Sequence, residues 1–312
     1  MSGAEKDLRP VLIAGPTASG KSALALAIAE RVGGTIINAD SMQVYRELRV
    51  LTARPPAADE ARVPHALYGF VPAREAYSAG RFVRDAADAI AKAQAERRRP
   101  IIVGGTGLYF KALLEGLSPI PEVREDVRAY WRGEAALRGA EALHAVLAER
   151  DPFMAARLKP SDAQRIVRAL EVLQSTGRSL ADWQALKGEP VLREAETIRF
   201  VVRVDRVELH ARADARFAQM VEAGGMEEAR TLSDMQLDPE LPAMRAIGVR
   251  PLLRVLGREI DIKDAILAAQ AETRQYIKRQ ETWLKSNMIS WNAIDAKEME
   301  SSVREIFAFI RS

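Results

Sequence analysis

The chain contains no cysteine and no long hydrophobic run, and both absences limit what it can be. Without cysteine there is neither a disulfide framework nor a thiolate metal site. No stretch of about 18 consecutive apolar residues occurs, so we expect no membrane span. The opening segment, MSGAEKDLRP, lacks the apolar centre of a secretory signal. These absences favour a cytoplasmic protein with no membrane association.

Histidine is also scarce. The three histidines, His65, His144 and His210, lie far apart, and none has the H-E-x-x-H spacing of a zinc site. We therefore expect no metal cage built from histidine. The remaining composition, 48% hydrophobic and 29% charged over 312 residues, is that of an ordinary globular protein with one large domain or two.

The net charge of +3 is small, but the basic residues form four clusters. Each cluster alone is typical of a solvated protein surface. Four clusters in one chain favour a polyanionic partner. The clusters are Arg97–Arg99, Arg165 with Arg168, Arg245 with Arg250, and Arg274 with Lys278, Arg279 and Lys285.

Short apolar runs alternate with helical patterns, which predicts an α/β fold with a parallel sheet flanked by helices. The segments "GPTASGKS", "NADSMQ" and "GGTGLY" each follow one of these runs. Ligands of such sheets bind beyond the carboxyl ends of the strands, so the three segments predict one site. The expected strands are 11–14, 35–37, 67–71, 101–103 and 198–204, and two clear helical patterns are 22–31 and 79–96.

Strand patterns are missing between about Ile120 and Lys187, where helical periodicity takes over. Within this stretch, Ser161 and Gln164 predict a capping box, and Gly177 predicts the end of the same helix. We divide the chain into a core of residues 1–119 and 191–312 and an inserted all-helical domain of residues 120–190.

The first of the three segments matches the P-loop pattern G-x-x-x-x-G-K-[ST], with a strand before it and a helix after it. Backbone N–H groups of such a loop bind phosphate oxygens, the lysine adds a positive charge, and the hydroxyl that follows it ligates Mg²⁺. The strand before "GGTGLY" ends without a Walker B acid, which argues against a hydrolytic NTPase but leaves a small-molecule kinase open. The P-loop residues are Gly15, Pro16, Thr17, Ala18, Ser19, Gly20, Lys21 and Ser22.

The residues at the other two strand ends allow two interpretations each. Asp40 either caps the next helix or acts as a general base near the phosphates. Thr106 either caps a helix or offers its hydroxyl to a ligand. The glycines around it, Gly104, Gly105 and Gly107, predict a close approach of backbone to ligand.

Two further polar positions remain open in the same way. Gln43 either hydrogen-bonds a nucleic-acid base or lies on the surface. The arginines Arg206, Arg212 and Arg216, on or before one predicted helix, form either a solvated face or an anion contact.

Taken together, these motifs resemble the tRNA dimethylallyltransferase family over residues 15–285. The chain differs from the common family pattern at three places. It reads "LTARP" where family members commonly read GTAKP, "PHAL" where they read PHHL, and "GVRP" where they read GYRQ. The last difference removes an aromatic residue and an amide at Val249 and Pro251. The motifs that carry the resemblance are "GPTASGKS", "ADSMQVYR", "TARP", "PHAL", "YSAGRF", "VGGTGLYFKALLEGLSP", "DAQRIVRALEV", "RAIGVR" and "TRQYIKRQETWLK".

The resemblance implies a P-loop NTPase-like fold and transfer of a dimethylallyl group from dimethylallyl diphosphate to N6 of adenosine 37 in tRNA. The P-loop would bind the diphosphate together with Mg²⁺, which Ser22 would ligate. Asp40 would accept the N6 proton, Thr106 would hold the reacting centre, and Arg216 would contact the diphosphate.

The resemblance also implies which residues bind tRNA. The expected partner is the anticodon stem-loop of tRNA, and the chain is expected to act as a monomer. Ser41, Met42 and Gln43 would line the adenine pocket. The residues implied to bind tRNA are Asp40, Ser41, Met42, Gln43, Thr106, Arg128, Gln164, Arg165, Ile166, Val167, Arg168, Arg245, Ala246, Ile247, Gly248, Val249 and Arg250.

Three alternatives stand beside a tRNA prenyltransferase: a P-loop kinase of a small metabolite, an isopentenyltransferase of free adenine nucleotides, and a nucleotide-switched RNA-binding protein. The helical insertion and the four basic clusters favour a macromolecular acceptor over the first two. The missing Walker B acid argues against the third.

Overall fold

The computed structural model describes residues 7–295 and 299–311. The chain forms two compact units: a core unit, Met1–Leu114 with Val191–Ser312, and an insertion unit, Glu115–Pro190. The sequence analysis places the inserted helical domain at residues 120–190. In the structure the insertion unit begins at Glu115, the last residue of the helix Gly107–Glu115.

The core unit is built on a six-stranded sheet with the order β3-β2-β4-β1-β5-β6, and every neighbouring pair is parallel. This confirms the predicted α/β class. The strands are β1 (Val11–Ala14), β2 (Gly34–Asn38), β3 (His65–Ala66), β4 (Arg99–Gly104), β5 (Ile198–Arg203) and β6 (Asn292–Asp295).

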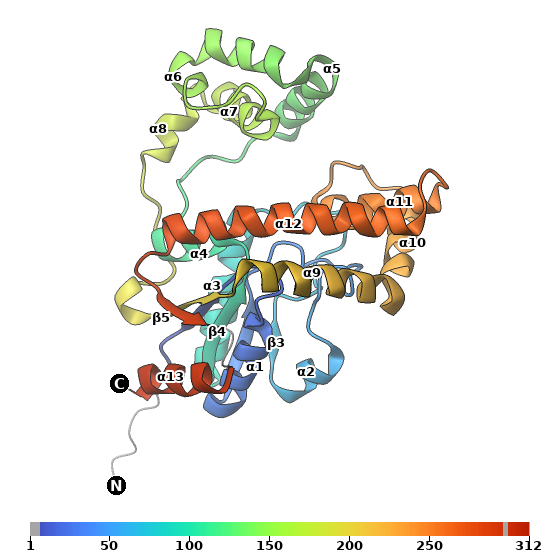
Figure 1. The fold of residues 1–312 in the computed structure, drawn as a ribbon. Helices are drawn as coiled ribbons and strands as arrows, with labels where there is room; N and C mark the ends of the chain where they lie inside the picture. The colour runs from blue at the N-terminus through green and yellow to red at the C-terminus, as the bar shows by residue number, and fades with distance from the viewer. Residues whose placement is uncertain (1–6, 296–298, 312) are drawn as a thin grey trace. The chain divides into compact units, whose positions relative to one another are not determined.

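Helices cover both faces of this sheet, as its continuous apolar strands require. On β1, the Val11 and Ile13 side chains pack on one face with α1 and α13, whereas Leu12 and Ala14 pack on the other face with α3, α4 and α12 (Figure 1). The core helices are α1 (Lys21–Val32), α2 (Ala57–Arg62), α3 (Ala79–Ala95), α4 (Gly107–Glu115), α9 (Arg206–Met220), α10 (Met226–Asp234), α11 (Val249–Leu256), α12 (Ile262–Asn287) and α13 (Met299–Arg311). Short 3₁₀ segments occupy Glu194–Glu196 and Pro242–Arg245, and a π-helical turn occupies Val221–Gly225.

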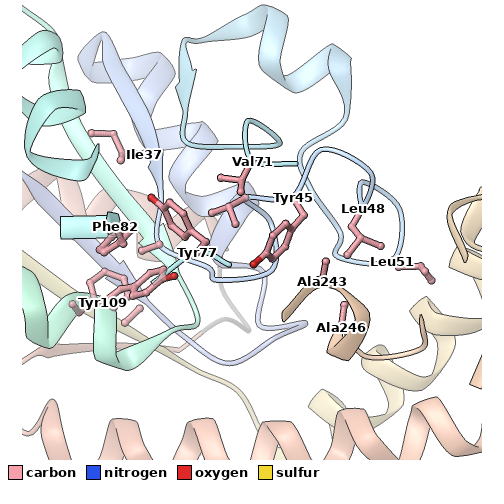
Figure 2. Packing of buried hydrophobic residues seen from close by; sticks show 14 of the residues in the cluster. Ile37, Tyr45, Leu48, Leu51, Val71, Tyr77, Phe82, Tyr109, Ala243 and Ala246 are labelled. Carbon is pink, nitrogen blue, oxygen red and sulfur yellow. The ribbon is translucent and has the colours of Figure 1, made fainter. Parts of the chain in front are cut away.

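The larger hydrophobic cluster reaches from the sheet to the loops at its carboxyl edge. The rings of Phe82 and Tyr109 stack with centroids 3.8 Å apart and 6° between their planes. Leu51 and Ala246 extend this cluster away from the sheet (Figure 2). The loops that follow the strands are therefore anchored in the core and hold their side chains in fixed positions.

Two strand predictions differ from the structure. Residues 67–71 do not continue β3, because Leu67 and Gly69 have φ angles of 64° and 56°, which end an extended chain. Only Val71 makes an isolated bridge, to Tyr45. The sequence analysis did not predict β6, a strand at the edge of the sheet that pairs with β5 and exposes most of its side chains.

The insertion unit is helical throughout its regular structure. Its longest helix is interrupted at Gly139, whose φ of 79° is non-helical. The unit has a core of its own, in which the Trp131 ring is 3% exposed and donates from Nε1 to Gln174 Oε1 at 2.9 Å. Its helices are α5 (Glu125–Arg150), α6 (Pro152–Ala155), α7 (Ala163–Thr176) and α8 (Leu180–Gln184).

The start of α7 differs from the predicted capping box. Asp162, and not Ser161, is the N-cap, and its carboxylate accepts a hydrogen bond from the Arg165 N–H at 3.3 Å. Both residue types cap helices well, so the choice between neighbouring caps depends on where the preceding turn ends. The predicted stop at Gly177 is confirmed, with a left-handed φ of 67°.

Candidate active site

The P-loop follows β1 and leads into α1, as the motif predicts. Ala18 and Gly20 both adopt positive φ angles, 62° and 83°, which turn the chain sharply before the helix. The Ser19 hydroxyl is buried, with no hydrogen-bond partner among the described residues. A Cβ on Gly15 would lie 2.8 Å from that hydroxyl and 3.2 Å from the Val202 Cβ, so the loop packs closely against β5 here.

The Lys21 ammonium folds back over the loop and donates to the Pro16 carbonyl at 3.1 Å. The pKa of Lys21 is lowered to about 8, mainly by burial; the Asp40 carboxylate opposes this shift and the neighbouring Arg216 adds to it. An anion bound in the loop would raise this pKa again.

Asp40 lies directly after β2, in a loop held by its own hydrogen bonds. Asn38 accepts from the Asp40 N–H and donates to the Asp40 and Leu67 carbonyls, all at 2.9–3.0 Å. One Asp40 carboxylate oxygen accepts from the Met42 N–H at 2.9 Å. These contacts fix the direction of the carboxylate before any ligand binds.

Thr106 connects the loop after β4 to the Asp40 loop. Its N–H donates to the Ala39 carbonyl at 3.2 Å, and its hydroxyl accepts from the Ser41 N–H at 3.0 Å. The hydroxyl also donates to the Ser41 hydroxyl at 3.3 Å. Ser41, the residue after Asp40, is therefore engaged with Thr106, which ties the Asp40 loop to the loop after β4.

Arg216 on α9 reaches the same place from a distant part of the sequence. Its guanidinium donates a hydrogen bond to the Thr17 hydroxyl of the P-loop. Burial lowers the pKa of Arg216, and the Asp40 carboxylate opposes that shift. The other two arginines of this segment pair with carboxylates outside the cavity: Arg206 with Glu281 and Arg212 with Glu208.

Thr17, Asp40 and Arg216 meet at one cavity of ≈ 580 Å³ that is open to solvent. One part of its wall is polar, with Thr17, Asp40 and Arg216. The rest is largely apolar. The lining residues are Thr17, Asp40, Met42, Leu51, Thr52, Ala213, Arg216, Phe217, Met220, Ala246, Ile247, Thr273 and Tyr276. Leu51 and Ala246 are also members of the cluster in Figure 2.

The sequence analysis did not single out two side chains of α12 that belong to this site. Tyr276 lines the cavity, and burial together with the Asp40 charge raises its pKa, against hydrogen bonds with Thr106 and Gln280. Gln280, one turn later, contacts both the P-loop and the loop after β4. The motif "TRQYIKRQETWLK" contains both residues and was the available signal.

The glycines around Thr106 have close protein neighbours, which gives them a packing role besides the predicted approach to a ligand. A Cβ on Gly104 would lie 2.0 Å from the Ala39 carbonyl oxygen. On Gly105 it would meet the Gln280 amide at 2.3 Å, and on Gly107 the Trp283 ring at 2.1 Å. At Gly104 the obstacle is backbone, whereas at Gly105 and Gly107 side chains of α12 would have to shift to admit a Cβ.

Gln43 is placed differently from the implied adenine contact. Its amide donates to the carbonyls of Thr52 and Ala53 at 2.8 and 2.9 Å, and it is not among the residues that line the cavity. The amide nitrogen therefore fixes the "LTARP" segment, whereas Met42 and Thr52 form part of the cavity wall.

The segment 245–250 has two kinds of residue. Arg245 and Arg250 are exposed and both pair with Glu240. Ala246 and Val249 are buried, at 3% and 0% exposure, so their side chains do not reach the surface. Gly248 is buried with a φ of 89°, and Ile247 lines the cavity.

The remaining residues with an implied tRNA role lie in the insertion unit. On α7, Gln164 and Arg165 are exposed and Arg168 is partly exposed, with Arg165 paired to Asp162 at 3.1 Å. Arg128 on α5 pairs with Glu125 at 3.2 Å. Ile166 is fully buried in the core of this unit, and Val167 is partly buried against it.

Ser22, the implied Mg²⁺ ligand, is exposed at the start of α1 and lines a second cavity of ≈ 410 Å³ with Arg54, Asp59 and Tyr68. Within the part of the chain that the structure describes, no group of three or more His, Cys, Asp or Glu side chains could hold a metal ion. A single hydroxyl fits Mg²⁺ that takes its other ligands from phosphate oxygens and water. None of the helices in the described ranges is long and apolar enough to cross a membrane.

Comparison with known proteins gives concordant results. Family models described as IPP transferase and isopentenyl transferase match residues 43–287 and 9–65. The tRNA dimethylallyltransferase of Parvibaculum lavamentivorans is 53% identical over 97% of this chain and 96% of the relative. That of Nitrobacter hamburgensis is also 53% identical, over 94% of this chain and 92% of the relative.

Two solved structures extend the comparison to the fold. The tRNA isopentenylpyrophosphate transferase of Bacillus halodurans aligns with a TM-score of 0.70 and 31% identity, covering 97% of this chain and 96% of that one. A eukaryotic dimethylallyltransferase acting on tRNA aligns with a TM-score of 0.78 and 26% identity, covering 93% of this chain and 74% of that one. The sheet and its flanking helices are those of this P-loop NTPase-like fold.

Proposed function

This chain belongs to the tRNA dimethylallyltransferase family, and we propose from that membership that it transfers a dimethylallyl group from dimethylallyl diphosphate to tRNA. The acceptor we propose is N6 of adenosine 37, beside the anticodon. A tRNA acceptor also agrees with the names of the relatives better than a small metabolite or a free adenine nucleotide does. The enzyme would act in the cytoplasm as a monomer.

The observation that carries this proposal is the composition of the cavity beside the P-loop. Thr17 of the P-loop and Arg216, which is hydrogen-bonded to it, share one cavity with the Asp40 carboxylate. The apolar residues Leu51, Phe217 and Ile247 line the same space, which suits a five-carbon chain and an adenine ring. A kinase site would instead have to accommodate a polar acceptor.

In the proposed reaction, the N6 nitrogen attacks the allylic carbon and the carbon–oxygen bond to the diphosphate breaks. The Asp40 carboxylate accepts the proton that the amine loses, because an adenine amine is a weak nucleophile. Lys21 and Arg216 would stabilise the negative charge that develops on the diphosphate, as would the backbone N–H groups of the P-loop. The adenine must leave its stack to enter the cavity, which costs a few kcal/mol.

We propose Mg²⁺ as the metal ion, with the Ser22 hydroxyl as its protein ligand. When bound, it would neutralise part of the diphosphate charge. The exposed position of Ser22 at the start of α1 supports this assignment.

The tRNA contacts are proposed from exposed or partly exposed basic residues of both units. Arg245 and Arg250 in the core unit and Arg128, Arg165 and Arg168 in the insertion unit would contact the phosphate backbone. Ile166, Ala246 and Val249 are buried, so they would act by supporting the neighbouring residues. Three neighbouring residues would add side-chain contacts: Gln164, which is exposed, Val167, which is partly exposed, and Ile247, which lines the cavity.

Nucleoside mass spectrometry tests this function. An unmodified tRNA with adenosine at position 37 is incubated with dimethylallyl diphosphate and the protein, beside a matched transcript with guanosine at that position. We expect one prenylated adenosine per tRNA in the first transcript and none in the second. Modification of both transcripts would contradict position 37, and modification of neither would contradict the function.

A further inference from the structure

A buried amide on α12 joins the two loops that border the cavity. Gln280 is 6% exposed. Its Oε1 accepts a hydrogen bond from the Thr17 N–H at 2.9 Å, and its Nε2 donates to the Gly105 carbonyl at 2.9 Å. The side chain therefore connects the P-loop to the residue immediately before Thr106.

The space around this amide is closely filled. A Cβ on Gly105 would lie 2.3 Å from the Gln280 nitrogen and 3.3 Å from the Gly15 carbonyl oxygen. Because the amide is hydrogen-bonded to both loops, its displacement loosens a contact to each of them. The same face of α12 contacts the site at two other points, with Tyr276 at the cavity wall and Trp283 against Gly107.

Each loop that Gln280 holds carries a different part of the proposed chemistry. Thr17 receives the hydrogen bond of Arg216 and lines the cavity on the diphosphate side. Thr106, next to Gly105, binds the Ala39 carbonyl and the Ser41 N–H on either side of Asp40. Gln280 thus bonds Thr17 directly on one side of the site and the residue before Thr106 on the other.

We propose that Gln280 is a positioning residue, which sets the separation between the diphosphate-binding P-loop and the loops that carry Thr106 and Asp40. This inference rests on the proposed function and deepens it. The position needs an acceptor toward Thr17 and a donor toward Gly105, and an uncharged amide supplies both. Because in-line transfer requires the donor carbon and the amine at a fixed separation, a small displacement lowers the rate more than it lowers tRNA binding.

Gln280→Glu separates this role from a general loss of structure, because it keeps the size of the side chain. A carboxylate accepts from Thr17 but has no hydrogen for the Gly105 carbonyl, whereas a protonated carboxyl group restores both hydrogen bonds. We expect kcat to fall about 30-fold or more at about pH 8. Relative to the wild type, it should recover about tenfold by pH 6, since burial raises the pKa of a carboxyl group. The KM for tRNA should stay within about threefold, because no tRNA contact is removed.

Matched variants complete the experiment. Gln280→Met keeps a similar volume without hydrogen bonds, so we expect the loss of kcat without recovery at low pH. Gln275 is exposed on the same helix, and Gln275→Glu should retain the kcat and pH profile of the wild type. Thermal melting of each variant establishes that it is folded at the assay temperature.

Two results would overturn the positioning role: a Gln280→Glu kcat within about threefold of the wild type across the pH range, or a loss of kcat that low pH does not reverse. An absence of prenyl transfer by the wild-type protein would contradict the proposed function instead, so the two failures are distinguishable.

Discussion

Three charged side chains surround the space next to the P-loop, and their charges are unbalanced. Burial lowers the pKa of Lys21 and of Arg216, and the single Asp40 carboxylate partly compensates for both. A site that holds two desolvated cations and one anion favours an anionic ligand. A diphosphate would supply the missing negative charge.

The lowered pKa of Lys21 predicts how diphosphate affinity depends on pH. Below about pH 8 the ammonium is charged in the free protein, so affinity does not depend on this group. Above that pH the free protein loses the proton, and binding must take it up again. We therefore expect affinity to fall as pH rises above 8, by at most about tenfold per pH unit.

Isothermal titration calorimetry with inorganic diphosphate measures this effect. Lys21→Arg is the matched control, since a guanidinium stays charged throughout the range while the ligand titrates identically in both proteins. Equal pH profiles for the two proteins would contradict the assignment of the effect to Lys21.

Asp40 should be required for turnover but not for tRNA binding. Asp40→Asn keeps an oxygen acceptor for the Met42 N–H and removes the basic group. We expect kcat to fall by about 10²- to 10⁴-fold, with tRNA affinity within about threefold of the wild type. Asp88→Asn, which removes the same charge from the exposed face of α3, should leave both quantities unchanged. A variant of Asp40 with normal kcat would remove it from the role of base.

At the scale of elements, the junction between β4 and the Asp40 loop sets the geometry of the site. A Cβ on Gly104 would lie 2.0 Å from the Ala39 carbonyl oxygen, and backbone cannot move aside as a flexible side chain can. We expect Gly104→Ala to lower the free energy of unfolding by about 3 kcal/mol or more. Gly80→Ala on α3, where the nearest atom is 3.9 Å away, should instead stabilise by about 0.5 to 1 kcal/mol.

Urea unfolding of the two alanine variants distinguishes these effects, because the substitution is the same and both sites belong to the core unit. Equal stabilities for the two variants would mean that β4 and the Asp40 loop are not held as closely as described.

Helix α7 offers Arg165 and Arg168 on its surface, three residues apart. If both contact phosphates, replacing both with alanine should weaken tRNA binding. The slope of log K against log salt concentration should also become shallower, by about one to two. Arg84→Ala with Lys92→Ala, on exposed positions of α3, removes the same charge as a control. Binding measured from low to moderate salt gives both slopes, and an unchanged slope for the α7 variant would exclude these contacts.

At the scale of the whole molecule, local patterns predicted the elements that carry strong local signals. An apolar run predicted β1, the P-loop motif predicted the turn after it, and an alanine-leucine pattern predicted α1. The helical nature of the insertion followed from its periodicity. The edge strand β6 did not, because it exposes most of its side chains and lacks the buried pattern of a central strand.

The parts of the site that could not be predicted depend on contacts between distant residues. Thr17 and Gln280 are 263 positions apart, and no local pattern shows that this glutamine, and not Gln275, faces the P-loop. The protein neighbours of the glycines around Thr106, Ala39 after β2 and Gln280 and Trp283 of α12, likewise come from distant parts of the sequence. Family resemblance named Asp40, Thr106 and Arg216, and the structure brings Asp40 and Arg216 to one cavity, with Thr106 adjoining it.

The central claim is that the P-loop holds a diphosphate that leaves, and not a phosphate that is transferred. A donor labelled with radiocarbon in its prenyl group and radiophosphorus in its diphosphate tests this directly with unmodified tRNA. We expect radiocarbon on the tRNA and an equal amount of radiophosphorus free in solution as diphosphate. Radiophosphorus on the acceptor, or no radiocarbon on tRNA, would contradict the account.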